Sequence, residues 1–268
     1  PPPPSPPPEA AIKSDPHLTG LRGQKYDFTG IEGHYYCLIS DFTMLLNTKM
    51  DKAYTTGIYI DVATAETHKM RPDGTWMTEV GFVFAAEDEE THEMRSMTLE
   101  LLFSPPKGFS NEELAAHRSL VSNGYVLVDG KLMDTSIVNL KSAGAIRLKE
   151  SNSGTTVEVS ILGVFEAEFS LVPPPEEWDI PKEEQAQYSH INLKLHQIAL
   201  SPLAHGVLGS TQHLQFVDGE PVLEGHDKDG QGVLEGTAGD YEVPSLLSSK
   251  FTYSVTEDSA LTGKSFTA

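Results

Sequence analysis

The stretch His190-Ile191-Asn192-Leu193-Lys194-Leu195-His196 alternates polar and apolar residues without a break. Successive side chains of a β-strand point to opposite faces, so this alternation separates the two kinds of residue. It predicts a half-buried antiparallel strand. Its inward residues are Ile191, Leu193 and Leu195, and its outward residues are His190, Asn192, Lys194 and His196.

Similar segments recur along the chain, rich in Val, Ile, Thr, Tyr and Phe and separated by Gly, Pro, Asn and Asp. This pattern is typical of short strands joined by tight turns, so we predict an all-β antiparallel sheet or sandwich. The other expected strands are residues 25–29, 34–40, 43–48, 57–62, 75–84, 96–103, 125–128, 137–140, 145–150, 155–162 and 164–172, the strand just quoted extends over 190–199, and a last strand covers 248–256.

Turn and helix signals support this reading. Asn123-Gly124 and Asp129-Gly130 place a glycine where a hairpin requires a positive φ, as does Pro72-Asp73-Gly74. Ser110-Asn111-Glu112-Glu113 has the form of a capping box and predicts one short helix ending near His117. The glycine-rich acidic stretch 218–240 is typical of a long loop.

Charge limits the choice of partners. The 268 residues include 39 Asp and Glu against 19 Lys and Arg, a formal charge of -20. Such a chain repels phosphate backbones and anionic lipid surfaces, so we expect no nucleic-acid partner. No apolar run approaches the roughly 20 residues that span a bilayer, so no membrane insertion is expected. We found no phosphate-binding loop, dinucleotide-binding motif, nucleophile elbow or metalloprotease helix, and expect no cofactor.

The chain has a single cysteine, Cys37, so an intrachain disulfide is impossible. Cys37 lies in His34-Tyr35-Tyr36-Cys37-Leu38-Ile39-Ser40, a run of strand-forming residues. A thiol in such a strand is expected to be buried as a small hydrophobic group.

The chain begins Pro1-Pro2-Pro3-Pro4-Ser5-Pro6-Pro7-Pro8. Proline fixes φ and has no N–H to donate, so this leader is expected to form a polyproline II rod over residues 1–13. Such a rod buries nothing of its own, and only a packing partner, attached sugar or both would hold it in place. The absence of an initiator Met favours a mature secreted chain from which a signal has been removed.

Two groups of segments carry a family resemblance. Ser14-Asp15-Pro16-His17-Leu18-Thr19-Gly20 followed by Lys25-Tyr26-Asp27-Phe28-Thr29-Gly30 resembles the opening of von Willebrand factor type D domains. Four later segments resemble, in order, the root cap (late-embryogenesis-like) family of green plants: Tyr36-Cys37-Leu38-Ile39-Ser40-Asp41, Ser189-His190-Ile191-Asn192-Leu193, His205-Gly206-Val207-Leu208-Gly209-Ser210-Thr211, and Asp240-Tyr241-Glu242-Val243 before Leu246-Leu247.

This resemblance implies a secreted, β-rich module of type D-like fold with no established catalytic activity. The sequence departs from the family at its cysteines, because Cys37 matches the early cysteine while the late one, expected after Leu247, is missing from Ser248-Ser249-Lys250-Phe251. It also lacks the Asn/Asp-rich run of calcium-binding type D domains after Gly206-Val207-Leu208-Gly209, so no calcium is expected there.

The proline leader resembles the extensin-like segments of secreted plant proteins. By that resemblance its prolines become hydroxyproline carrying arabinose-rich O-linked glycans, and its serine is a candidate for galactose. Sugar along a rod without internal hydrogen bonds would stiffen it. No Asn-x-Ser/Thr sequon occurs in the chain. The candidate attachment residues are Pro2, Pro3, Pro4, Ser5, Pro6, Pro7 and Pro8.

Other candidate sites have simpler explanations. Asp227-Lys228-Asp229-Gly230 begins like a calcium loop, but an EF-hand would need a Glu at the position of Ala238, so Asp227 and Asp229 are expected to form an acidic surface turn. His190 and His196 lie six residues apart on one strand face, too far for a metal without a third ligand.

We therefore expect a non-catalytic extracellular structural glycoprotein of a cell wall, matrix or surface filament. Residues 1–13 would be the connecting arm, residues 14–256 the β domain and residues 257–268 a tail. The arm would pack on another copy, for which open sheet edges are docking places, and repeated head-to-tail contacts would form a filament.

Two alternatives stay open. One is a module that binds wall polysaccharide through exposed aromatic rings, with Trp178 and Tyr188 as candidates and with Trp76 expected to be buried in its strand. The other is a glycoside-acting enzyme whose two carboxylates lie far apart in sequence.

Overall fold

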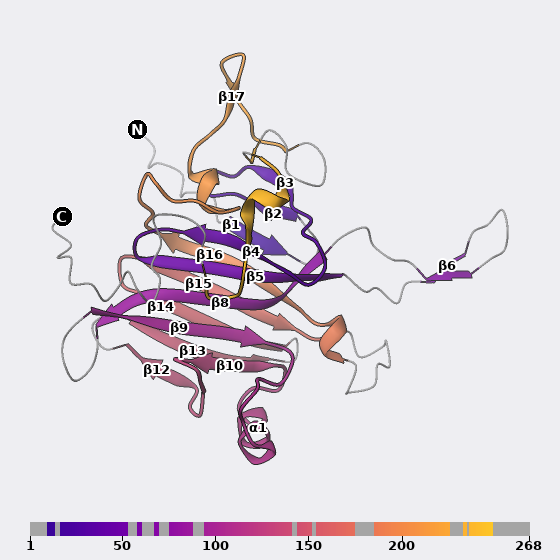
Figure 1. Cartoon of the computed structure of the whole chain (residues 1–268), viewed down its shortest axis with the longest axis vertical. Helices are drawn as coiled ribbons and strands as arrows, with labels where there is room; N and C mark the ends of the chain where they lie inside the picture. Colours follow the sequence, from indigo (N-terminus) through magenta and orange to yellow (C-terminus); the bar gives the residue numbers. More distant parts are fainter. Residues whose placement is uncertain are drawn as a thin grey trace.

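Strands from both ends of the chain build two large antiparallel sheets that face each other (Figure 1). The structure, a computed structural model, describes residues 10–13, 17–52, 58–60, 67–69, 75–87, 94–140, 144–151, 154–174, 185–225, 233–234 and 236–248. The prediction of a mostly β protein with one α-helix is confirmed for these residues.

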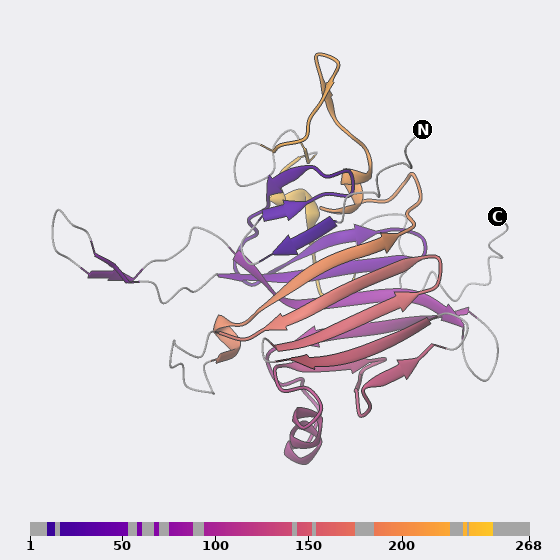
Figure 2. The same cartoon turned by 180° about the vertical axis from the view of Figure 1, so that it is seen from behind.

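The first sheet has eight strands in the order β12-β13-β14-β15-β16-β1-β2-β3, and its outward face is turned toward the viewer in Figure 2. Five consecutive strands form a meander, and three strands from the start of the chain extend it. The strands are β12 (Ile137–Asn139), β13 (Gly144–Ser151), β14 (Gly154–Ile161), β15 (Phe165–Val172), β16 (His190–Ile198), β1 (Ala10–Lys13), β2 (His17–Thr19) and β3 (Lys25–Asp27).

The second sheet has seven strands in the order β11-β10-β9-β8-β5-β4-β19. They are β11 (Lys131–Leu132), β10 (Tyr125–Val128), β9 (Met94–Leu102), β8 (Thr75–Glu87), β5 (Met44–Lys52), β4 (His34–Ser40) and β19 (Glu242–Val243). Two small hairpins complete the strands: β6 (Ile58–Ile60) with β7 (Thr67–Lys69), and β17 (Phe216–Val217) with β18 (Glu220–Pro221).

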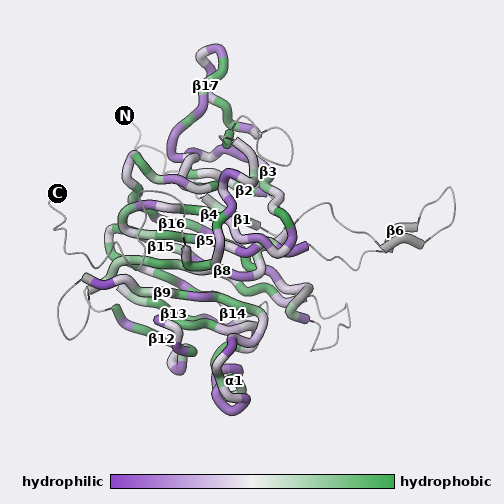
Figure 3. The backbone as a smooth tube through the Cα atoms, in the orientation of Figure 1, coloured by the Kyte–Doolittle hydropathy of each residue, from purple (hydrophilic) through white to green (hydrophobic). Residues whose placement is uncertain are grey.

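The core lies between the two sheets. Phe82 of β8 contacts Phe165 of β15 with ring centroids 4.6 Å apart, which joins the sheets directly. Strand β14 alternates half-buried and buried residues along its whole length, as a strand with one wet face should. In Figure 3 hydrophobic residues accordingly run along the strands of both sheets.

Several predicted elements have the expected bounds. Strands 34–40 and 125–128 match β4 and β10, and the burial of Ile191, Leu193 and Leu195 confirms the predicted inward face of β16. Asp129 and Gly130 adopt positive φ in the β10–β11 turn. Helix α1 (Asn111–Arg118) begins at Ser110 with both hydrogen bonds of the capping box.

Two predictions of segment structure were wrong. Residues 10–13 were expected in the polyproline rod, but Ala10–Lys13 form a strand inside the first sheet, because backbone N–H groups after the last proline can pair on both sides. The stretch 218–240 was expected to be one loop, but it begins inside the β17–β18 hairpin, and its last residues belong to the 3-10 helix η5 (Ala238–Tyr241). Of the last predicted strand, only Ser248 is described, and it is not in a strand.

Candidate functional site

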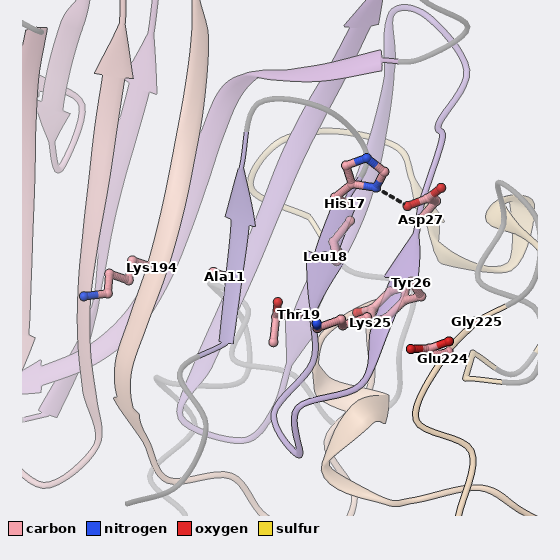
Figure 4. A pocket seen from close by; sticks show the side chains of 10 residues that line it. All are labelled: Ala11, His17, Leu18, Thr19, Lys25, Tyr26, Asp27, Lys194, Glu224 and Gly225. Atoms are coloured by element: carbon pink, nitrogen blue, oxygen red, sulfur yellow. Dashed lines mark hydrogen bonds and ion pairs between the residues drawn. The ribbon is translucent and has the colours of Figure 1, made fainter.

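A polar groove of about 490 Å³ lies on the outward face of the first sheet, across strands β16, β1, β2 and β3 (Figure 4). Its walls combine cationic and anionic side chains with a short apolar floor. The lining residues are Ala11, His17, Leu18, Thr19, Lys25, Tyr26, Asp27, Lys194, Glu224 and Gly225.

The strand register explains why the groove is present at this place on the sheet. Lys194 pairs with Ala11, Ala11 pairs with Thr19, and Thr19 pairs with Lys25, so these four side chains form one row across the sheet. Figure 4 shows them in that order. Cross-strand partners share a face of the sheet, and the small Ala11 between two longer residues leaves a depression in the row.

The far wall comes from a segment distant in sequence. The backbone N–H of Lys25 donates to the carbonyl of Leu223 at 2.8 Å, and the N–H of Gly225 donates to the carbonyl of Lys25 at 2.7 Å. These bonds hold Glu224 opposite Lys25 as if it belonged to a further strand. The edge of β3 is therefore partly covered, and an acidic side chain is fixed beside a basic one.

One pair of oppositely charged side chains lies in the groove. His17 Nδ1 contacts a carboxylate oxygen of Asp27 on the neighbouring strand, which Figure 4 marks with a dashed line. Both side chains are exposed, so this pair contributes little to folding stability. Lys25, Lys194 and Glu224 also line the groove, so it offers both cationic hydrogen-bond donors and anionic acceptors. The chain as a whole is strongly acidic.

The floor of the groove is structural. Tyr26 is 3% exposed, and its hydroxyl donates to the carbonyl of Val207 at 2.9 Å. Burial raises the pKa of Tyr26 well above its usual value, and the neighbouring Tyr241 raises it further. Tyr26 therefore stays a neutral anchor, and ligand binding would rely on the polar side chains around it.

Tyr188, one of the two aromatic residues predicted to bind sugar, does not line this groove. Tyr188 ends the 3-10 helix η3 (Gln185–Tyr188) and is half-buried. Trp76, expected to be buried, is only half-buried, and its ring lies 4.7 Å from that of His190. Trp178, Asp227, Asp229 and the candidate glycosylation residues at positions 2–8 lie outside the described residues.

The strand histidines have separate surroundings. His196 Nε2 lies 3.1 Å from Glu168 of the adjacent strand. His190 packs against Trp76, and burial lowers its pKa to about 4. Within the described ranges, no three His, Cys, Asp or Glu side chains are grouped so that they could hold a metal.

Three of the segments that carry the family resemblance, those at residues 36–41, 205–211 and 240–247, meet around strand β4. Val207 and Leu208 donate backbone N–H bonds to Cys37 and Leu38 at 2.9 and 2.8 Å, and Val243 pairs with Tyr35. Leu247 packs on the buried cluster that contains Cys37, which confirms the predicted burial of this thiol.

Comparison with known proteins adds no family assignment, because no protein-family model matches the chain and no curated protein matches it significantly. None of the helices in the described part of the chain has the length and apolar character needed to cross a bilayer.

The sequence patterns did not predict that the charged residues of this groove lie together. His17, Lys25 and Asp27 lie on strands too short to show a period, and Glu224 joins them only through tertiary backbone pairing. The alternation of polar and apolar residues in β16 predicts that Lys194 faces outward. This alternation is the one local sequence feature that indicates a residue of the groove.

Proposed function

We propose that this chain is a non-catalytic extracellular structural glycoprotein that assembles through its proline-rich leader into a wall, matrix or surface filament. The supporting observation is the position of β1, the strand that directly follows the leader. Ala11 and Ile12 pair with β16 on one side and with β2 on the other. The chain thus continues from the leader into an interior strand of the first sheet.

This attachment suits a load-bearing connector. A strand bonded on both sides resists a pull along its axis through several backbone hydrogen bonds at once. Ile12 and Leu18 are a register pair, and both are buried in the main core. A force applied to the leader would therefore act on a strand whose side chains pack in the core.

In this proposal the leader contacts the next copy through side-chain surfaces, and not through an open sheet edge. The strands that end the two sheets are short in the described structure: β3 and β12 have three residues each, and β11 and β19 have two. Short edge strands offer few free backbone groups to a neighbour. Addition of a neighbouring strand to an open edge, the docking mode expected from the sequence, is therefore disfavoured.

Two experiments test the proposal. The native protein should have an intact mass above 29.2 kDa in pentose steps, because O-linked arabinose on the leader adds one pentose at a time. Electron microscopy should show filaments from the full chain and none from a chain lacking Pro1–Pro8. An unmodified native mass would remove the glycoprotein claim, and unchanged filaments would remove the connector claim.

Binding of a wall polysaccharide is a second candidate function, favoured by the groove beside Lys25 and Lys194. Its polar side chains could hydrogen-bond to sugar hydroxyls, although the described lining offers no exposed aromatic ring for stacking. Lys25→Ala should then abolish a glycan-array signal that Lys149→Ala, elsewhere on the same sheet face, retains. Equal signals from the two variants would exclude the groove as the binding site.

A further inference from the structure

The polar groove on the first sheet includes the strand that follows the proline leader. Ala11 of β1 lies in its lining, between Lys194 and Thr19 in the row across the sheet. In Figure 4 the ammonium group of Lys25 lies beside Thr19, its register partner. The groove therefore has a small residue at its centre and two hydrogen-bond donors next to it, the Thr19 hydroxyl and the Lys25 ammonium.

The proline leader has the complementary chemistry. Proline has no backbone N–H, and a polyproline II rod has no internal hydrogen bonds, so the carbonyls of such a rod are unpaired acceptors. A site that holds the rod has to supply donors, as Thr19 and Lys25 do. The small Ala11 leaves room for a proline ring above the sheet.

The charges of the leader and the groove are compatible. Pro1–Pro8 consists of proline and one serine and carries no charged side chain. The groove lining sets Lys25 and Lys194 against Asp27 and Glu224, so it does not demand a charged ligand. Two chains of formal charge -20 repel each other, and a leader without charged side chains approaches such a chain more easily than another acidic surface would.

The lengths of the leader and the groove also agree. The groove crosses the four neighbouring strands β16, β1, β2 and β3, which together span about 14 Å. A polyproline II rod rises about 3.1 Å per residue, so Pro1–Pro8 would be about 25 Å long. About five of its residues would fill the groove, and the rest would bridge to the copy from which the leader comes.

The leader cannot reach the groove of its own copy. Only Glu9 separates Pro8 from Ala10, the first residue of β1. A reversal of the chain takes a turn of about four residues, while consecutive prolines keep one another extended. The occupant within reach is therefore the leader of a second copy.

We propose that Pro1–Pro8 of one copy lies in this groove of the next copy, with its carbonyls accepting hydrogen bonds from Thr19 and Lys25. This inference rests on the proposed role of the leader in assembly and names the surface that receives it. Each copy has one leader and one such groove, so the contact is head-to-tail and continues from copy to copy unless the rotation closes a ring.

Cysteine cross-linking of the full chain tests the contact. Ser5→Cys marks the middle of the leader, and Ala11→Cys marks the centre of the groove without removing either donor, while the native Cys37 is buried. A mixture of the two single variants should form mixed dimers on air oxidation, identified by the disulfide-linked peptides that contain positions 5 and 11. A chain with both substitutions should form a ladder of longer polymers.

Ser160→Cys is the matched control, because Ser160 is a small half-buried residue of β14 outside the groove, on the outward face of the same sheet. Mixed with Ser5→Cys it should give about tenfold less dimer than Ala11→Cys does, since only a docked leader has a high local concentration at the groove. Addition of Lys25→Ala to the Ala11→Cys chain should also lower the yield of mixed dimer.

Three results would overturn the contact: equal yields from Ala11→Cys and Ser160→Cys, no mixed dimer at all, or a bridge formed only within one chain when both substitutions are present. These failures are distinct from a failure of the proposed function. If deletion of Pro1–Pro8 abolishes filaments while Ala11→Cys gives no cross-link, the leader is a connector that docks on another surface.

Discussion

The side-chain amide of Asn47 donates to the backbone carbonyl of Leu246 at 3.0 Å, across 199 residues of sequence. The same amide also reaches the carbonyls of Ser245 and Ser248, at 3.4 and 2.8 Å. Asn47 is fully buried in the central strand β5. One side chain therefore fastens the last described segment of the chain over the second sheet.

Replacement of Asn47 by leucine should release this segment. The substitution keeps the approximate size but removes the donors, which leaves buried carbonyls unpaired at a cost of about 1–3 kcal/mol. Hydrogen exchange should increase in residues 242–248. Ser248→Ala, which removes an exposed side-chain bond in the same segment, should change stability by less than about 0.5 kcal/mol. Unchanged exchange in Asn47→Leu would refute the fastening role.

Gly206 should tolerate no side chain. Its φ is +99°, and a Cβ there would lie 2.6 Å from the carbonyl carbon and oxygen of Leu38. Gly206→Ala should destabilise the fold by roughly 3 kcal/mol or more, measured by urea denaturation. Gly33→Ala has a similar φ of +81° but open space, so it should cost only about 1–2 kcal/mol. Equal losses in the two variants would show that contact with β4 is unimportant.

His190 should make the fold sensitive to acid. Burial lowers its pKa from 6.5 to about 4, so the unfolded chain binds a proton more readily between these values. The contribution to stability is fully present above pH 6.5 and is lost as pH falls toward 4, by about 3 kcal/mol in total. His190→Phe keeps a ring against Trp76 without titrating, so its unfolding free energy should fall less steeply over this range. Identical pH slopes for the two proteins would contradict the assignment.

Cys37 should resist thiol reagents in the native protein. It is fully buried among Leu45, Val83 and Val243, so reaction requires local opening of the sheet or its cover. A chromogenic disulfide reagent should label it slowly in buffer and rapidly in urea. Fast labelling of the native chain would mean that the Val243 cover is open in solution.

Local sequence patterns predicted the body of the fold well. Strand β4 and helix α1 follow from a run of strand-forming residues and a capping box, each contained within a few positions. The Phe216-Val217-Asp218-Gly219 stretch carries the same Asp-Gly signal as the hairpin at Asp129, and it was overlooked because the surrounding acidic, glycine-rich composition is typical of loops.

The groove could not be predicted in this way. Lys194 and Ala11 are neighbours through strand register, which depends on how β1 enters the sheet after the leader. In the same way, His117 joins helix α1 to Val126 in β10 and to Met133, the residue after β11. Such long-range pairings leave no periodic trace in the sequence.

The role of the leader as connector is tested most directly by sedimentation velocity over a range of concentrations, comparing the native full chain with a chain lacking Pro1–Pro8. We expect the full chain to form species that grow with concentration, and the shortened chain to sediment as a smaller species whose association is strongly weakened. Two proteins with the same concentration-dependent profile would contradict assembly through the leader.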